Sequence, residues 1–171
     1  MRIISGYLRG RKITQPNNKL TRPLKDLMKE SIFNILQHSN LISFSLEKSK
    51  ILDLFSGVGS FGLECISRGA QNVIFCENYS EAIKILKKNI TNLKCHQKTQ
   101  IITKNIFNIK NLNQFHKKKF EIIFLDPPYK EKKLTNLLDD ILSLKLLKNN
   151  GIIIIHRHKK EEEIYPKKFK I

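Results

Sequence analysis

The sequence has no tryptophan, only three cysteines, and 15 acidic residues against 32 basic ones. No apolar run approaches the roughly 18–20 residues of a membrane span, and the first twelve residues lack the apolar region of a secretory signal. We therefore predict a cytoplasmic protein that does not contact a membrane. Cys65, Cys76 and Cys95 form no CxxC pair, which favours reduced structural thiols. No spacing resembles a metal site, and the pair His156 and His158 is interpreted as structural.

Acidic residues are also missing before Asp26, whereas four of the six arginines lie within the first 22 positions. Lysine content varies with the base composition of a genome, so the net charge of +17 is weak evidence for a nucleic-acid partner. Arginine is stronger evidence, because its planar guanidinium binds phosphate bidentately. We predict that this end contacts nucleic acid, with a merely solvated basic end as the alternative; the residues expected to bind are Arg2, Arg9, Arg11, Lys12 and Arg22.

Two short strands and one helix are expected in the first 50 residues. Residues 2–5 and 12–14 flank a turn with two glycines, which predicts a β-hairpin. Thr21 and Pro23 favour the start of a helix. Apolar residues at helical spacing then predict one buried stripe, formed by Leu24, Leu27, Met28, Ser31, Ile32, Ile35 and Leu36.

From residue 50 onward, short apolar runs alternate with helical patterns. Strands are expected at 51–55, 72–76, 100–103, 120–125 and 151–155. Helices are expected between them, at 60–68, 80–92, 132–147 and, more weakly, 112–118. This alternation predicts a doubly wound, mostly parallel α/β sheet of Rossmann-like type.

Three glycines follow the first of these strands, at Gly57, Gly59 and Gly62. They match the GxGxxG fingerprint of a nucleotide-binding turn, and Glu77 stands 20 residues after Gly57, where an acid would accept hydrogen bonds from ribose hydroxyls. Asp53 lies four residues before Gly57, where its charge would repel a pyrophosphate. S-adenosylmethionine (SAM) carries an ammonium and a sulfonium and no phosphate. The segment therefore favours SAM, with a dinucleotide or simple tight packing as alternatives.

A second motif, Asp126-Pro127-Pro128-Tyr129, follows the buried strand expected at 120–125. Prolines interrupt strand pairing and leave the Pro127 carbonyl without an obvious partner. The Asp126 carboxylate and this carbonyl could together accept both N–H groups of an exocyclic amine, and Tyr129 would stack on the base. A proline-rich loop that merely closes a strand is the alternative.

These residues together resemble the RsmD family of bacterial methyltransferases, which modify the exocyclic N2 of a guanine in small-subunit (16S) ribosomal RNA. The matching stretches are 2–6, 9–12, 21–23, 31–36, 53–62, 67–70 and 120–129. The resemblance implies a SAM-dependent enzyme, expected to be a monomer, that binds ribosomal RNA or the small subunit. Residues 1–22 would form the RNA-contacting arm and residues 23–171 the methyltransferase domain. The residues expected to bind the cofactor are Asp53, Phe55, Gly57, Gly59, Gly62, Glu77, Asn105 and Ile106.

Three departures from the family pattern stand out. Leu24 occupies a position that is usually threonine, and Asn105 occupies one that is commonly an acid. Five core strands are expected against the family's seven, so we expect two C-terminal strands to be absent. Two further interpretations stay open: an adenine-N6 methyltransferase acting on DNA or RNA, and a non-catalytic RNA-binding or ribosome-assembly protein.

Overall fold

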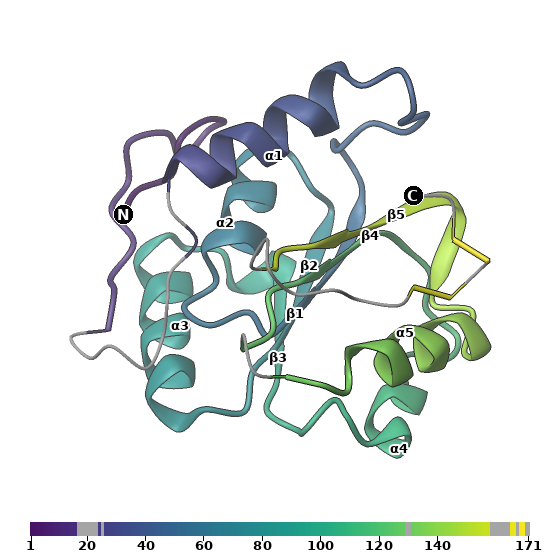
Figure 1. Ribbon diagram of the computed structural model, residues 1–171. Helices are drawn as coiled ribbons and strands as arrows, with labels where there is room; N and C mark the ends of the chain where they lie inside the picture. Colours follow the sequence, from purple (N-terminus) through teal and green to yellow (C-terminus); the bar gives the residue numbers. More distant parts are fainter. Residues whose placement is uncertain (17–23, 25, 129–130, 158–164, 167, 170–171) are drawn as a thin grey trace.

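The computed structural model describes residues 1–16, 24, 26–128, 131–157, 165, 166, 168 and 169, and it contains one five-stranded sheet (Figure 1). The strands are β1 (Lys50–Leu54), β2 (Asn72–Cys76), β3 (Thr99–Ile102), β4 (Phe120–Leu125) and β5 (Leu147–Ile155). All pairs are parallel, in the order β3-β2-β1-β4-β5. This confirms the predicted parallel α/β fold.

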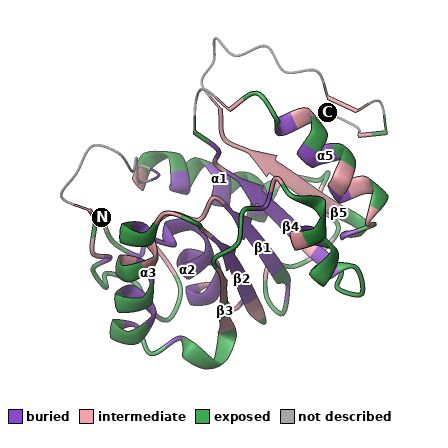
Figure 2. Cartoon of the chain, turned by 90° about the horizontal axis from the view of Figure 1, so that it is seen from below, coloured by how far each residue is buried: buried purple, intermediate pink, exposed green. Residues whose placement is uncertain are grey.

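Helices cover both faces of the sheet because alternate strand residues point to opposite sides. One face packs against α1 (Asp26–His38), α2 (Ser60–Ser67) and α3 (Ser80–Asn92), and its core includes Phe61 and Phe124. The other face packs against α4 (Ile109–Leu112), the 3₁₀ turn Asn113–Phe115 and α5 (Leu134–Ser143). Figure 2 shows the central strands buried between these layers, whereas β5 is only half-buried. None of the helices in the described part of the chain is long and apolar enough to cross a membrane.

The ends of four strands lie level at one edge of the sheet. Leu54 pairs with both Cys76 and Leu125, and Leu125 pairs with Ile155. The strand order reverses between β1 and β4, and open parallel sheets bind ligands in the crevice outside such a reversal. The residues that directly follow β1, β2, β4 and β5 therefore meet at one place, and the glycine-rich turn, Glu77 and Asp126 are among them.

The predicted N-terminal hairpin is wrong. Only one isolated antiparallel bridge forms, between Arg2 and Lys12. The reason is that backbone groups of this segment hydrogen-bond to α2: Ile4 N–H and Ser5 N–H donate to the two carboxylate oxygens of Glu64, at 2.8 and 2.9 Å. Residues 1–16 form a loop docked on α2, with Ile3, Leu8 and Ile13 buried in the common core.

Helix α1 exists as predicted, but its buried face differs from the predicted stripe. Ile32 and Leu36 are buried, whereas Leu27 and Ile35 are 77% and 62% exposed and Met28 is also exposed. The helix is rotated because Lys29 and Phe33 face inward: the Lys29 ammonium donates to the Arg2 carbonyl at 2.7 Å, and the Phe33 ring stacks on Phe61. Leu24 lies in this core as well, which explains an apolar residue at that position. Residues 21–23, the predicted start, lie outside the described residues.

The other elements differ from the predictions mainly at their ends. The predicted helix 132–147 is shorter, Leu134–Ser143, and β5 begins four residues earlier than expected, at Leu147. The weak helix expected at 112–118 is a single turn at 109–112 followed by a 3₁₀ turn. Within the described residues no strand follows β5, in line with the expected five-stranded sheet. The three cysteines are free and buried, as predicted.

Candidate active site at the carboxyl edge of the sheet

The glycine-rich turn after β1 contains two glycines required by packing and one that faces open space. A Cβ on Gly59 would lie 2.4 Å from Leu86 Cδ1, and one on Gly62 would lie 2.3 Å from Phe75 Cε1. Gly57 has a left-handed φ of 55°, and no heavy atom lies within 4 Å of the place its Cβ would take. This vacant position is where a ligand could approach the backbone closely.

Alanine substitutions at Gly57 and Gly62 should therefore have different effects, the first on ligand binding and the second on folding. Gly57→Ala adds a methyl group to the open side of the turn at a strain cost of about 1 kcal/mol, so SAM binding should weaken while the fold persists. Gly62→Ala drives a methyl group into Phe75 and should cost about 3 kcal/mol of stability. Calorimetric titration with SAM and thermal unfolding of both variants measure this. Equal SAM affinity in Gly57→Ala and the unaltered protein would contradict the assignment.

Asp53 lies beneath the turn, with 1% of its surface exposed. Its Oδ2 accepts from Gly62 N–H at 3.1 Å, which ties β1 to the first turn of α2. Its Oδ1 is buried and has no hydrogen-bond partner among the described residues. Burial raises the pKa of this carboxyl well above its usual range; the Gly62 hydrogen bond opposes the rise, and the charges of Asp126 and Glu77 add to it.

The raised pKa of Asp53 predicts a pH-dependent effect of Asp53→Asn. Because the folded carboxyl holds its proton more tightly than the unfolded one, the unaltered protein loses stability as pH rises from about 4, the pKa of an unfolded Asp, through the folded pKa. Asp53→Asn has no such loss, so its advantage in stability should be largest at neutral pH and shrink on acidification. Denaturant unfolding of both proteins from pH 4 to pH 8 tests this. An advantage that grows toward pH 4 would contradict it.

Glu77, which directly follows β2, accepts hydrogen bonds from two backbone segments. Its Oε2 accepts from Gly57 N–H at 2.7 Å, and its Oε1 accepts from Asn78 and Tyr79 N–H, each at 2.9 Å. A carboxylate has about four acceptor positions, so one remains for a ribose hydroxyl. The carboxylate thus holds the glycine-rich turn in place and stays available for the predicted contact.

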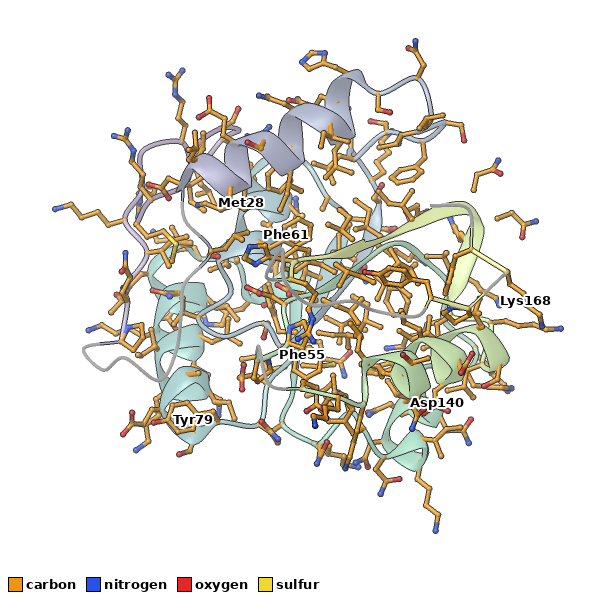
Figure 3. All side chains as sticks on the ribbon, in the orientation of Figure 1. Met28, Phe55, Phe61, Tyr79, Asp140 and Lys168 are labelled. Carbon is orange, nitrogen blue, oxygen red and sulfur yellow. The ribbon has the colours of Figure 1, made fainter. Side chains whose placement is uncertain are left out.

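The side of the site formed after β3 is partly aromatic. Asn105 is exposed and its Oδ1 accepts from Phe107 N–H at 3.0 Å, whereas Ile106 is buried. Phe107 in turn contacts Phe55, with ring centroids 5.3 Å apart. Figure 3 shows Phe55 at the centre of the molecule, where β1 ends. Sequence reasoning missed Phe107, although it directly follows the predicted pair of Asn105 and Ile106.

Asp126 follows β4 and is held by its neighbours on both sides. Its N–H donates to the Leu54 carbonyl at 3.4 Å, and its Oδ1 lies 2.9 Å from Nδ1 of His156, the residue that follows β5. The Asp126 side chain is 23% exposed. No donor among the described residues reaches the carbonyl of the buried Pro127. Within the described residues, the Pro127 carbonyl and Oδ2 of Asp126 thus have no hydrogen-bond donor.

His156 and Arg157 are functional candidates that the sequence analysis did not identify. His156 was interpreted as structural, yet it contacts the carboxylate of Asp126. Arg157 donates to the carbonyls of Pro128 and Glu131, at 3.0 Å each. The signal that could have found them is position, because both follow a strand adjacent to β4. Tyr129 and Arg22 lie outside the described residues, as does His158.

Three acids, Asp53, Glu77 and Asp126, lie at this edge of the sheet, after or near the ends of β1, β2 and β4. Their charges interact, since Asp126 and Glu77 both raise the pKa of Asp53. The Glu77 and Asp126 carboxylates at this edge would repel a pyrophosphate and suit a ligand with positive charge. The acceptors on Glu77 and Asp126, the unpartnered Asp53 oxygen and the vacant side of Gly57 all fit SAM. No group of His, Cys, Asp and Glu in the described chain could hold a metal ion.

The cationic N-terminal segment is attached to the same site. Arg2, Arg9, Arg11 and Lys12 are all exposed, and Arg11 donates to the Asn92 carbonyl at 3.1 Å. The buried Asn89 of α3 exchanges hydrogen bonds with Thr14, donating to its carbonyl and accepting from its N–H. The same amide donates to the Val58 carbonyl in the glycine-rich turn at 3.0 Å. Asn89 therefore ties the N-terminal segment directly to the turn.

The strand order and the residues at the carboxyl edge of the sheet identify the class of this protein: it has the SAM-dependent methyltransferase fold. The S-adenosylhomocysteine-bound Podospora anserina methyltransferase PaMTH1 has the same fold, with a TM-score of 0.56 and 20% identity over 63% of this chain and 45% of that one. The chain belongs to the RsmD family, whose model, described as Conserved hypothetical protein 95, matches residues 1–171.

Relatives of known name support the same family. Ribosomal RNA small subunit methyltransferase D of Buchnera aphidicola is 36% identical over 168 residues, 96% of this chain and 82% of the relative. The Haemophilus influenzae protein of that name is 35% identical over 173 residues, 97% of this chain and 83% of its own. The crystal structure of H. influenzae HI0767 superposes with a TM-score of 0.71 and 30% identity, covering 96% of this chain and 85% of that one.

Proposed function

We propose that this protein transfers a methyl group from SAM to the exocyclic N2 of a guanine in 16S ribosomal RNA. The observation that carries the proposal is the position of two acceptors, the Asp126 carboxylate and the Pro127 carbonyl, at the edge that also holds the glycine-rich turn. The names of the relatives at 35–36% identity support the substrate class.

The chain's own residues contribute mainly positioning. The cofactor supplies an electrophilic methyl group on a sulfonium. Asp126 and the Pro127 carbonyl would accept the two N–H groups of the guanine amine and direct its lone pair at that methyl group, which lowers the barrier by fixing the orientation of the reactants. The Asp126 charge also stabilises the positive charge that develops on the nitrogen. That nitrogen becomes acidic once methylated and loses its proton afterwards.

A guanine must leave its stack to reach this edge, so an unstacked base in a loop or junction is the expected target. The cationic residues Arg2, Arg9, Arg11, Lys12 and Arg22 would bind the flanking phosphates, and Tyr129 would stack on the base. Residues 1–22 thus form the proposed RNA-contacting segment and residues 23–171 the catalytic domain. The link through Asn89 supports this division of labour, because it places the segment beside the turn.

Transfer of labelled methyl from SAM tests the proposal. Small ribosomal subunits from cells lacking the modification, RNA extracted from them, and duplex DNA serve as parallel substrates. We expect label in the first or second substrate, recovered as N2-methylguanine after digestion. Label recovered as N6-methyladenine would contradict the guanine assignment. SAM binding without label in any substrate would contradict the proposed reaction.

The arginines of the N-terminal segment give a further prediction. Replacing Arg9 and Arg11 together by alanine removes two exposed cations, so RNA affinity should fall. The slope of log K against log salt should decrease by about 1.4, at roughly 0.7 per phosphate contact on a single strand. Filter binding across a salt series measures this. Lys110 and Lys117, exposed near α4, are a matched control, and an equal loss in Lys110→Ala with Lys117→Ala would contradict a specific role.

A further inference from the structure

We propose that His156 and Arg157, the two residues that follow β5, are positioning residues that hold the amine-accepting pair in its reactive geometry. This inference rests on the proposed role of Asp126 and Pro127. Both side chains reach the loop that follows β4 from the adjacent strand, and each is hydrogen-bonded to it. They act through the loop and are not themselves proposed to contact the reacting atoms.

The sheet itself brings His156 to Asp126. Leu125 of β4 pairs with Ile155 of β5, and His156 N–H continues the ladder by donating to the Leu125 carbonyl at 2.9 Å. The residues one step further along adjacent parallel strands therefore lie side by side, with their side chains on the same face. The pairing of Asp126 with His156 follows from strand register and needs no loop to arrange it.

The direction of the hydrogen bond between His156 and Asp126 determines which carboxylate oxygen remains for the substrate. A carboxylate only accepts, so Nδ1 of His156 must be the donor to Oδ1 of Asp126. This bond fixes the rotation of the carboxylate and leaves Oδ2 for the amine. The two side chains are 24% and 23% exposed, so the pair borders solvent and is accessible to a base.

Arg157 restrains the backbone beside the second acceptor, the Pro127 carbonyl. Its two terminal nitrogens donate to Pro128 and Glu131, which lie on either side of residues 129 and 130. A guanidinium fork that binds two carbonyls fixes their separation, which a lysine cannot do. The fork therefore restrains the backbone next to Pro127, whose carbonyl is the second acceptor. A misplacement of about 1 Å at a reacting group can reduce the rate about 100-fold.

Alanine and asparagine substitutions at His156 distinguish positioning from a purely structural role. Asparagine places an N–H donor close to the position of Nδ1, whereas alanine does not. We expect kcat to fall about 10- to 100-fold in His156→Ala, with SAM affinity and Tm unchanged, and His156→Asn to recover most of kcat. Arg157→Lys should likewise lower kcat without changing Tm. His116→Ala, an exposed histidine after α4, is the matched control and should have full activity.

A second measurement detects the pair without any turnover. Nδ1 of His156 lies 2.9 Å from the Asp126 carboxylate, and Arg157 is its neighbour in the chain. NMR titration of His156 should show a lower midpoint in Asp126→Asn than in the unaltered protein, because a carboxylate favours the charged imidazolium. The His116 midpoint should not move.

The outcomes separate this inference from the proposed function. Full kcat in His156→Ala, failure of asparagine to recover kcat, or a His156 midpoint that ignores Asp126→Asn would overturn the positioning role while methyl transfer to RNA still stands. Loss of Tm in step with kcat in His156→Ala would also overturn it, since the residue would then be structural. A shifted midpoint with no methyl transfer by the unaltered protein would confirm the pair and refute the proposed function.

Discussion

Asp126→Ala is expected to lower the rate of methyl transfer by about 10²–10³-fold, the usual cost of losing one preorganised group at the reacting centre. The affinity for SAM should change little, because the glycine-rich turn, Asp53 and Glu77 are all retained. Alanine removes both the acceptor for the amine and the negative charge that stabilises the developing cation. Single-turnover methyl transfer and calorimetric SAM titration of the same preparation measure the two effects separately.

Asparagine at the same position separates orientation from charge. Asp126→Asn keeps an oxygen that can accept from His156 or from the amine, but it carries no charge. We therefore expect a rate between those of Asp126→Ala and the unaltered protein. Asp139→Ala, an exposed carboxylate on α5, is the matched control and should have full activity. Turnover by Asp126→Ala at the rate of the unaltered protein would refute the catalytic assignment.

The catalytic half of the fold could be predicted from sequence because its signals are local. β2, β4 and α3 have the predicted bounds. Continuous apolar runs of four residues, at 73–76 and 122–125, favour buried parallel strands, and α3 buries Ala82, Leu86, Asn89 and Ile90 along one stripe. The glycine-rich turn and the motif after β4 also lie at the predicted edge, because each directly follows such a strand.

The N-terminal half was predicted less well because long-range contacts determine it. The hairpin failed since Glu64 and Ser67 accept the N–H groups of Ile4, Ser5 and Leu8, about 60 residues away in sequence. In sequence, Glu64 has no feature that marks it as a fully buried acid. His156 was missed for a related reason: it pairs with Asp126 through strand order, and no local pattern states which strands are neighbours.

The second large effect is expected at Glu64, whose substitution should lower both stability and RNA affinity. Its side chain is fully buried on α2, and besides Ile4 and Ser5 it binds Arg68 Nε at 2.8 Å. Its Oε2 lies 3.7 Å from the ammonium of Lys29, which is also fully buried. Burial lowers the pKa of Lys29, and the charges of Glu64 and Asp26 oppose this shift. One carboxylate thus joins the N-terminal segment, α1 and α2.

Glu64→Ala should cost about 3–5 kcal/mol, because it removes the nearby negative charge from a buried ammonium and the acceptor from two backbone N–H groups. For a chain of this size the Tm should fall by roughly 6–20 °C. RNA affinity should fall as well, since the cationic segment loses its attachment to α2. Thermal unfolding and filter binding measure the two effects, and Glu30→Ala, at an exposed acid on α1, should change neither.

Gly6→Ala tests the attachment without touching the charges. A Cβ at Gly6 would lie 1.8 Å from the backbone oxygen of Ser67, so the loop must move away from α2. If docking of the segment is what places Arg9 and Arg11 for RNA, Gly6→Ala should lose RNA affinity as Glu64→Ala does. Stability should fall less, because Lys29 keeps the nearby Glu64 carboxylate. Equal stability of Glu64→Ala and Glu30→Ala would contradict the buried cluster. Full RNA affinity in Gly6→Ala would instead show that the cations act without being docked.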